Sequence, residues 1–112
     1  VDATRGWAYR NTKDRGYTTV TANVTAIAGD QILANTTGGA FTVTLPASPV
    51  VGNEVVVIDA RGTFGTNNLT VARNGEPINT GTSDLILSTN GQAITLVYVD
   101  ATRGWAYKTN TA

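Results

Sequence analysis

The chain has 112 residues, of which 41% are hydrophobic and only 14% are charged, and its formal net charge is zero. This length is enough for one domain with a single core, and the composition is too apolar for an intrinsically disordered chain. Eight cationic side chains balanced by eight anionic ones give no basic surface, so nucleic acid is not an expected partner.

The chain begins with a sequence that recurs near its end. Val-Asp-Ala-Thr-Arg-Gly-Trp-Ala-Tyr occupies residues 1–9 and again residues 99–107, so the offset is 98 residues. Such a period has the size of a domain, not that of a solenoid unit of ~20–50 residues. We therefore interpret residues 1–10 as the last strand of a preceding repeat, residues 11–16 as a linker and residues 17–112 as one β-sandwich repeat. The alternative is an engineered or permuted chain whose ends were made alike.

Strand signals follow one another between the two copies. Apolar and threonine side chains alternate at 17–27, 41–45 and 69–71. The largely apolar run at 54–60 predicts a strand that is covered on both faces or central in its sheet. Shorter strands are expected at 31–35, 84–88 and 93–99, separated by Gly-Gly and Asn-Gly turns. No helical period is found, so we predict an all-β fold, an antiparallel and jelly-roll-like β-sandwich of about 7–9 short strands.

The last two strands are predicted to form a C-terminal hairpin closed by the Asp100–Gly104 turn. Asp is favoured at the first position of such a turn, and Gly can adopt the left-handed conformation that follows it. Trp105 and Tyr107 then share one face of the returning strand and are expected to cover the edge of the core.

The N-terminal copy contains the turn and the returning strand but lacks the incoming one. An apolar strand without a partner invites pairing with another chain or domain. We therefore expect Trp7 and Tyr9 to dock on a neighbouring subunit or domain, the alternative being a frayed end.

Catalysis finds little support in the residue inventory. Without histidine or cysteine, Ser-His-Asp sites, Cys-His sites, disulfides and thiolate metal sites are all excluded. A calcium site would have to use scattered carboxylates, namely Asp30, Asp59, Asp84 and Asp100. A glycosidase pair would have to come from Glu54, Asp59, Glu76 and Asp100, and no spacing selects two of them. We predict a protein that is not an enzyme and has no cofactor and no metal site.

Aromatic side chains offer a second kind of site, a platform on which sugar rings stack. Tyr98, Trp105 and Tyr107 gather in the last hairpin, although a tryptophan on an alternating strand is more often a core residue. Phe64 lies in a glycine- and asparagine-rich loop, where an apolar ring has less structural reason to be. The candidate ligand or interface residues are therefore Trp7, Tyr9, Phe64, Tyr98, Trp105 and Tyr107.

The order of several short motifs resembles a known class of module. These are Gly39-Ala-Phe-Thr-Val-Thr-Leu-Pro-Ala-Ser-Pro49, Gly62-Thr-Phe64, Asn67-Asn-Leu-Thr-Val71, Arg73-Asn-Gly75, Asp84-Leu-Ile-Leu87, Thr95-Leu-Val-Tyr98 and Gly104-Trp105. The string, which covers roughly residues 31–108, resembles β-domain modules repeated in bacteriophage virion proteins, especially tail fibres and related appendages. Residues 11–30 match this pattern less clearly.

The resemblance implies a rigid module in a fibrous, commonly trimeric assembly that binds a bacterial surface or presents the adhesin to it. It supplies no catalytic or binding residues to carry over. The expected location is the virion, or otherwise the extracellular space. The expected partners are further copies of the chain, neighbouring repeats and bacterial surface glycan, with neither nucleic acid nor membrane insertion. The alternatives are a carbohydrate-binding β-sandwich module and a bacterial extracellular surface repeat.

Overall fold

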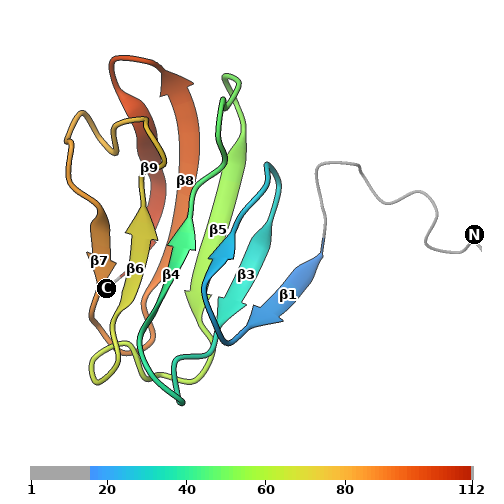
Figure 1. Cartoon of the computed structure of the whole chain (residues 1–112), viewed down its shortest axis with the longest axis vertical. Helices are drawn as coiled ribbons and strands as arrows, with labels where there is room; N and C mark the ends of the chain where they lie inside the picture. Colours follow the sequence, from blue (N-terminus) through green and yellow to red (C-terminus); the bar gives the residue numbers. More distant parts are fainter. Residues whose placement is uncertain (1–15, 112) are drawn as a thin grey trace, which may run out of the picture.

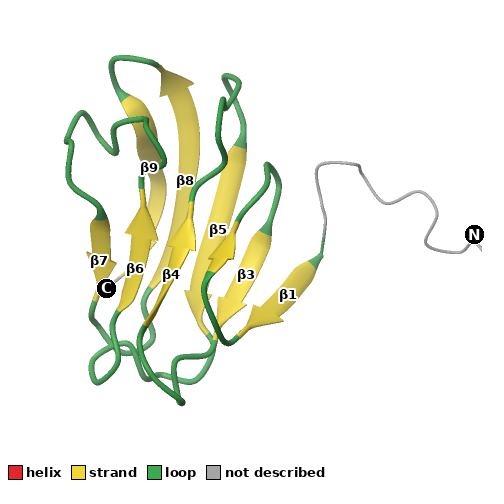
Figure 2. Cartoon of the chain, viewed as in Figure 1, coloured by secondary structure: helices red, strands yellow, loops and turns green. Residues whose placement is uncertain are grey.

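The computed structural model describes residues 16–111, which form nine strands and no helix (Figures 1 and 2). In chain order these are β1 (Tyr17–Val20), β2 (Val24–Thr25), β3 (Gln31–Ala34), β4 (Phe41–Thr44), β5 (Glu54–Asp59), β6 (Leu69–Ala72), β7 (Leu85–Leu87), β8 (Ala93–Asp100) and β9 (Gly104–Thr111). The all-β prediction is confirmed. Among these described residues, no helical segment could serve as a membrane span.

The strands form two mixed sheets. The first has five strands in the order β1-β3-β5-β8-β9, and the second has four in the order β2-β4-β6-β7. From β1 to β6 the chain alternates between the sheets, and each strand from β1 to β4 pairs in parallel with the one two places later. The last three strands pair antiparallel, β7 with β6 and β8 with both β5 and β9.

The predicted antiparallel fold is therefore wrong for the first half of the chain, and these parallel pairs do not confirm the jelly-roll part of the prediction. Period-2 alternation identifies a strand and its buried face but does not identify its partner. The sequence predicted a single strand at 17–27, and alternation alone could not show that this segment is divided. The chain leaves one sheet after Val20 and enters the other at Val24. The side chain of Asn23 secures this crossing, since its Oδ1 accepts the Thr42 N–H at 2.8 Å.

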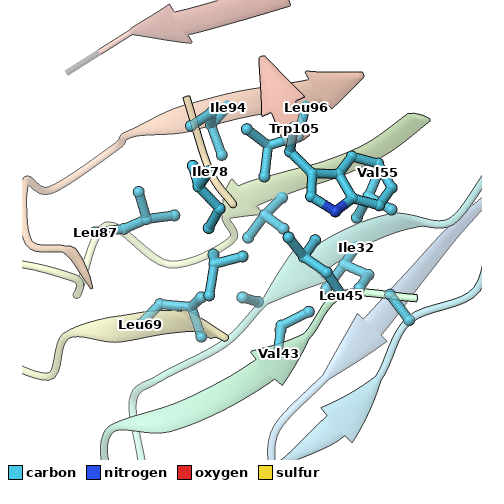
Figure 3. Close-up of a cluster of buried hydrophobic side chains, with 14 of the residues drawn as sticks. Ile32, Val43, Leu45, Val55, Leu69, Ile78, Leu87, Ile94, Leu96 and Trp105 are labelled. Carbon is cyan, nitrogen blue, oxygen red and sulfur yellow. The ribbon is translucent and has the colours of Figure 1, made fainter. Parts of the chain in front are cut away.

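One hydrophobic core contains side chains from both sheets. In Figure 3 the labelled side chains of Val43 and Leu69 from one sheet and of Val55 and Leu96 from the other converge on a common centre. β5 is the third of five strands, which confirms the central position expected for the apolar run. Its buried residues alternate with half-buried ones, so one face carries the core. Each fully buried aliphatic side chain stabilises the fold by about 1.5–3 kcal/mol.

The C-terminal hairpin is confirmed, with β8 and β9 joined through the Asp100–Gly104 turn. The Oδ1 atom of Asp100 accepts the N–H groups of Thr102 at 3.0 Å and Arg103 at 2.7 Å. Gly104 has a φ of +72°, in the left-handed region that a side chain rarely adopts. Its backbone also passes so close to Pro77 that no side chain fits between them.

Gly104→Ala is expected to destabilise the protein by about 3 kcal/mol or more, because the new methyl group would overlap the Pro77 carbonyl in addition to straining φ. The matched control is Gly75→Ala, where φ is +94° but the space around the new Cβ is open. The control should lose only about 1 kcal/mol. Urea unfolding followed by tryptophan fluorescence measures both values, and equal losses would show that the close approach to Pro77 contributes nothing.

Candidate functional site

The carboxylate of Asp59 accepts four backbone hydrogen bonds. It lies at the end of β5 and is 7% exposed. Its Oδ1 accepts the backbone N–H groups of Arg61 at 3.3 Å and Thr63 at 3.1 Å, and its Oδ2 accepts those of Phe64 at 3.1 Å and Gly91 at 2.9 Å. The side chain thereby joins the loop after β5 to the turn before β8.

These contacts make Asp59 a structural anion. Burial by itself would raise the pKa of Asp59, but the N–H donors of Gly91, Phe64, Thr63 and Arg61 together hold the pKa below its ordinary value. A carboxylate that already accepts four hydrogen bonds has little capacity left for a cation or a substrate proton. Asp59 therefore lacks the properties of a general acid or a calcium ligand.

The other nominated carboxylates each have a local partner. Asp30 accepts the Ile27 N–H at 2.8 Å, Asp84 accepts the Arg73 N–H at 2.9 Å, and Asp100 caps its own turn. Glu54 pairs with Lys108 at 3.1 Å, and Glu76 accepts the Tyr98 hydroxyl at 2.9 Å. Across residues 16–111, no three acidic side chains gather into a group that could hold a metal ion.

The aromatic candidates differ in their exposure. The side chains of Phe64 and Trp105 are fully buried, so neither ring is presented to a ligand. Tyr98 is 7% exposed and packs edge-on against Trp105, with 5.5 Å between the ring centroids. Tyr107 is 38% exposed on β9. Trp7 and Tyr9 lie outside the described residues, and so does the docking that we expect of them.

The loop that contains Phe64 explains why the sequence suggested a ligand contact at this residue. It is rich in glycine and asparagine, yet side chains elsewhere hold it in place. Asn90 Oδ1 accepts the Gly65 N–H at 2.7 Å, and the Phe64 N–H is bound by Asp59. The loop is therefore folded over the end of the core with the Phe64 ring inside it. An Asp at a strand end followed by a glycine-rich loop was the available signal for this arrangement.

Burial and hydrogen bonding combine at Tyr98. Desolvation, the hydrogen bond to Glu76, and the negative charges of Glu76 and Asp100 all raise the pKa of Tyr98. The Tyr98 hydroxyl is thus kept neutral as a donor to Glu76, which ties the loop after β6 to β8. The Nε1–H group of the neighbouring Trp105 is buried and has no hydrogen-bond partner among the described residues.

The loop after β6 covers the beginning of β9. Pro77 O accepts the Trp105 N–H at 2.9 Å, and the Asn79 N–H donates to Trp105 O at 2.7 Å. The Thr80 N–H donates to Arg103 O at 2.9 Å. Residues 77–80 therefore shield the outer edge of β9 where that strand begins.

Sequence reasoning did not find an exposed apolar rim formed by Ile27, Val50, Val51 and Val99. These side chains are 50%, 66%, 71% and 38% exposed. The loops that carry Ile27 and the two valines meet at the start of β5, because Gly29 N–H donates to Glu54 O at 2.8 Å. Val99 lies beside them near the end of β8, where Gly52 N–H donates to Tyr98 O at 2.9 Å. The loops lie at one end of the molecule, the top in Figure 1. Two valines between Pro49 and Gly52, in a segment where polar turn residues are usual, were the available signal.

Asp59→Asn is expected to destabilise the fold by about 2 kcal/mol, because the amide nitrogen cannot accept the N–H groups that one carboxylate oxygen now accepts. Asp84→Asn is the matched control, since its remaining oxygen can still accept the Arg73 N–H, and it should lose no more than about 0.5 kcal/mol. Urea unfolding at neutral pH measures both. Similar losses in the two variants would show that the hydrogen bonds of Asp59 to the two loops do not stabilise the fold.

The same analysis predicts a pH dependence. The pKa of Asp59 is lower in the folded chain than its unfolded value of about 4, so its stabilisation is present above that value. It is lost as the pH falls through the folded-state pKa. Stability measured by urea unfolding from pH 6 to pH 2 should therefore fall more in the parent protein than in Asp59→Asn. Parallel curves would show that Asp59 does not carry the effect.

Comparison of the chain with models of protein families and with curated proteins found no match.

Proposed function

We propose that the chain is a structural and adhesive repeat module of a phage virion appendage, such as a tail fibre, that supports attachment to the host surface. The observation that carries the proposal is the duplicated nonapeptide. In its C-terminal copy, these residues form the end of β8, the turn and the start of β9, which close the five-stranded sheet. The recurring segment therefore contains the turn that closes the sheet, which supports a protein in which such domains follow one another.

The chemistry of the described surface supports a structural role. The carboxylates that could act in catalysis are held by local partners, Asp59 most of all. A two-layer, sandwich-like arrangement around one core also suits a module that transmits load. Tandem copies of such a module multiply weak surface contacts through effective concentration.

The apolar rim supports self-association, and we favour a trimer. Three of its four side chains are at least half exposed, and their loops are held together by backbone hydrogen bonds. Apolar side chains gathered at one end of a molecule favour burial against another protein surface. Sugar binding gains no comparable support, because the rings of Phe64 and Trp105 are buried.

We expect the purified chain to form a stable oligomer, with a molar mass by light scattering that is a multiple of the monomer value. The double variant Val50→Ser and Val51→Ser should shift it toward the monomer. The matched control is Ile86→Ser, since Ile86 is 49% exposed on β7, outside the rim. A parent chain that stays monomeric at the highest soluble concentration would contradict self-association through the rim.

The location is tested with antibodies raised against the chain and used for gold labelling in electron microscopy. We expect label on the appendages of virions released from an infected host culture. Label on the envelope of uninfected cells would instead favour a bacterial surface repeat. Titration with host polysaccharide, followed by NMR, tests the carbohydrate-binding alternative, because sugar binding requires shift changes at Tyr98, Trp105 or Phe64.

A further inference from the structure

The five-stranded sheet has a second face, which points away from the core. Successive residues of a strand point to opposite faces, so the neighbours of the buried side chains Val55, Val57 and Ile94 point outward. These outward side chains are half-buried and mostly aliphatic. They are Leu33 on β3, Val56 and Ile58 on β5, Ala93, Thr95 and Val97 on β8, and Ala106 on β9. We call this surface the aliphatic face.

The pairing register makes the aliphatic face continuous. Residues directly opposite each other on neighbouring strands project from the same face, about 5 Å apart. Three rows of such partners cross the sheet, namely Leu33–Ile58–Ala93, Val56–Thr95 and Val97–Ala106. The aliphatic side chains therefore form one patch that extends over four neighbouring strands.

The outer face of the four-stranded sheet has a different composition. Its outward side chains are Thr25, Thr42, Thr44, Thr70, Ala72 and Ile86. Threonine keeps the β-branched shape that suits a strand and presents a hydroxyl to water. Strands that are covered on both faces have continuous apolar runs instead, as β5 does from Val55 to Ile58. The composition of the aliphatic face is therefore that of a covered surface, although the four-stranded sheet packs only on the opposite side.

The aliphatic face has no net charge. Its charged side chains within residues 16–111 are Glu54 and Lys108, which form an ion pair at 3.1 Å. A neutral apolar surface gives a charged partner nothing to complement, and it matches a second surface of the same kind. Sheets pack face to face about 10 Å apart. The surface that best complements this one is therefore the same face of a second copy, in an isologous contact.

The size of the aliphatic face suits a weak pair. A sheet of five strands, each contributing about five residues, spans roughly 400 Å² in projection. Two such faces bury on the order of 1,000 Å² of accessible surface, which is near the lower limit for a specific interface. A pair formed in this way is expected to depend on protein concentration.

We propose that two copies of the chain pack their aliphatic faces against each other, sheet on sheet. The two four-stranded sheets then lie on the outside, with their threonine-rich faces toward water. This contact goes beyond the proposed function, because it uses neither the apolar rim nor the virion assignment.

The reactivity of a single introduced thiol tests the contact, since the chain has no cysteine of its own. Thr95→Cys places the thiol in the aliphatic face, and Thr70→Cys, the matched control, places it on the outer face of the other sheet. Both threonines are half-buried on strands with a neighbour on each side. The Thr95→Cys thiol should react with dithiobis-nitrobenzoate about tenfold more slowly at protein concentrations far above the Kd, because only the free copy exposes it. The Thr70→Cys rate should not change.

Three outcomes would overturn the proposal. A Thr95→Cys thiol that reacts fast at every soluble concentration would show that the face is not covered. A slow rate in samples that light scattering shows to be monomeric would assign the cover to another part of the same chain. Equal slowing of the Thr95→Cys and Thr70→Cys thiols would indicate nonspecific aggregation.

The double variant Val56→Thr and Val97→Thr, made in the Thr95→Cys chain, identifies the surface involved. It should raise the concentration needed for half-protection by about tenfold, because it removes apolar contact and retains the β-branched shape. Val50→Ser with Val51→Ser, in the apolar rim, is the matched control and should leave the protection unchanged. Protection that is lost in the rim variant would assign the contact to the rim and refute pairing through the aliphatic face.

Discussion

The fold depends on the antiparallel pairing of β5 with β8. The strands from β1 to β6 form two parallel ladders, one in each sheet, and every pair made by β7, β8 or β9 is antiparallel. The β5–β8 ladder joins these two halves within one sheet. It also sets Val55 opposite Leu96 and Val57 opposite Ile94, and all four side chains are buried. Backbone hydrogen bonding and apolar burial thus act at the same register, and a shift by one residue would turn the apolar series of one strand toward solvent.

Sequence reasoning predicted the fold class, most strand positions and the closing hairpin. These features depend on local signals, namely period-2 alternation, Asn-Gly turns, and an Asp and a Gly at the two ends of one turn. The parallel pairing of the first six strands could not be predicted in this way. The partner of β3 is β5, and it is chosen by long-range packing that leaves no mark on the residues of β3 itself.

The candidate site was predicted less well than the fold. Phe64 was read as a loop aromatic because polar and glycine residues surround it, whereas its backbone is bound to Asp59 and its ring is buried. Asp59 was considered only as one of several scattered carboxylates, and its hydrogen bonds to four backbone donors were not foreseen. In both cases the deciding contacts come from the loop that folds over the core, and local sequence does not reveal how such a loop closes.

The alternation of the first six strands between the two sheets has a mechanical consequence. Each connection from β1 to β6 crosses from one sheet to the other, so neither sheet can separate from the core without pulling on the strands of its neighbour. The two sheets are therefore expected to unfold together, as one cooperative unit.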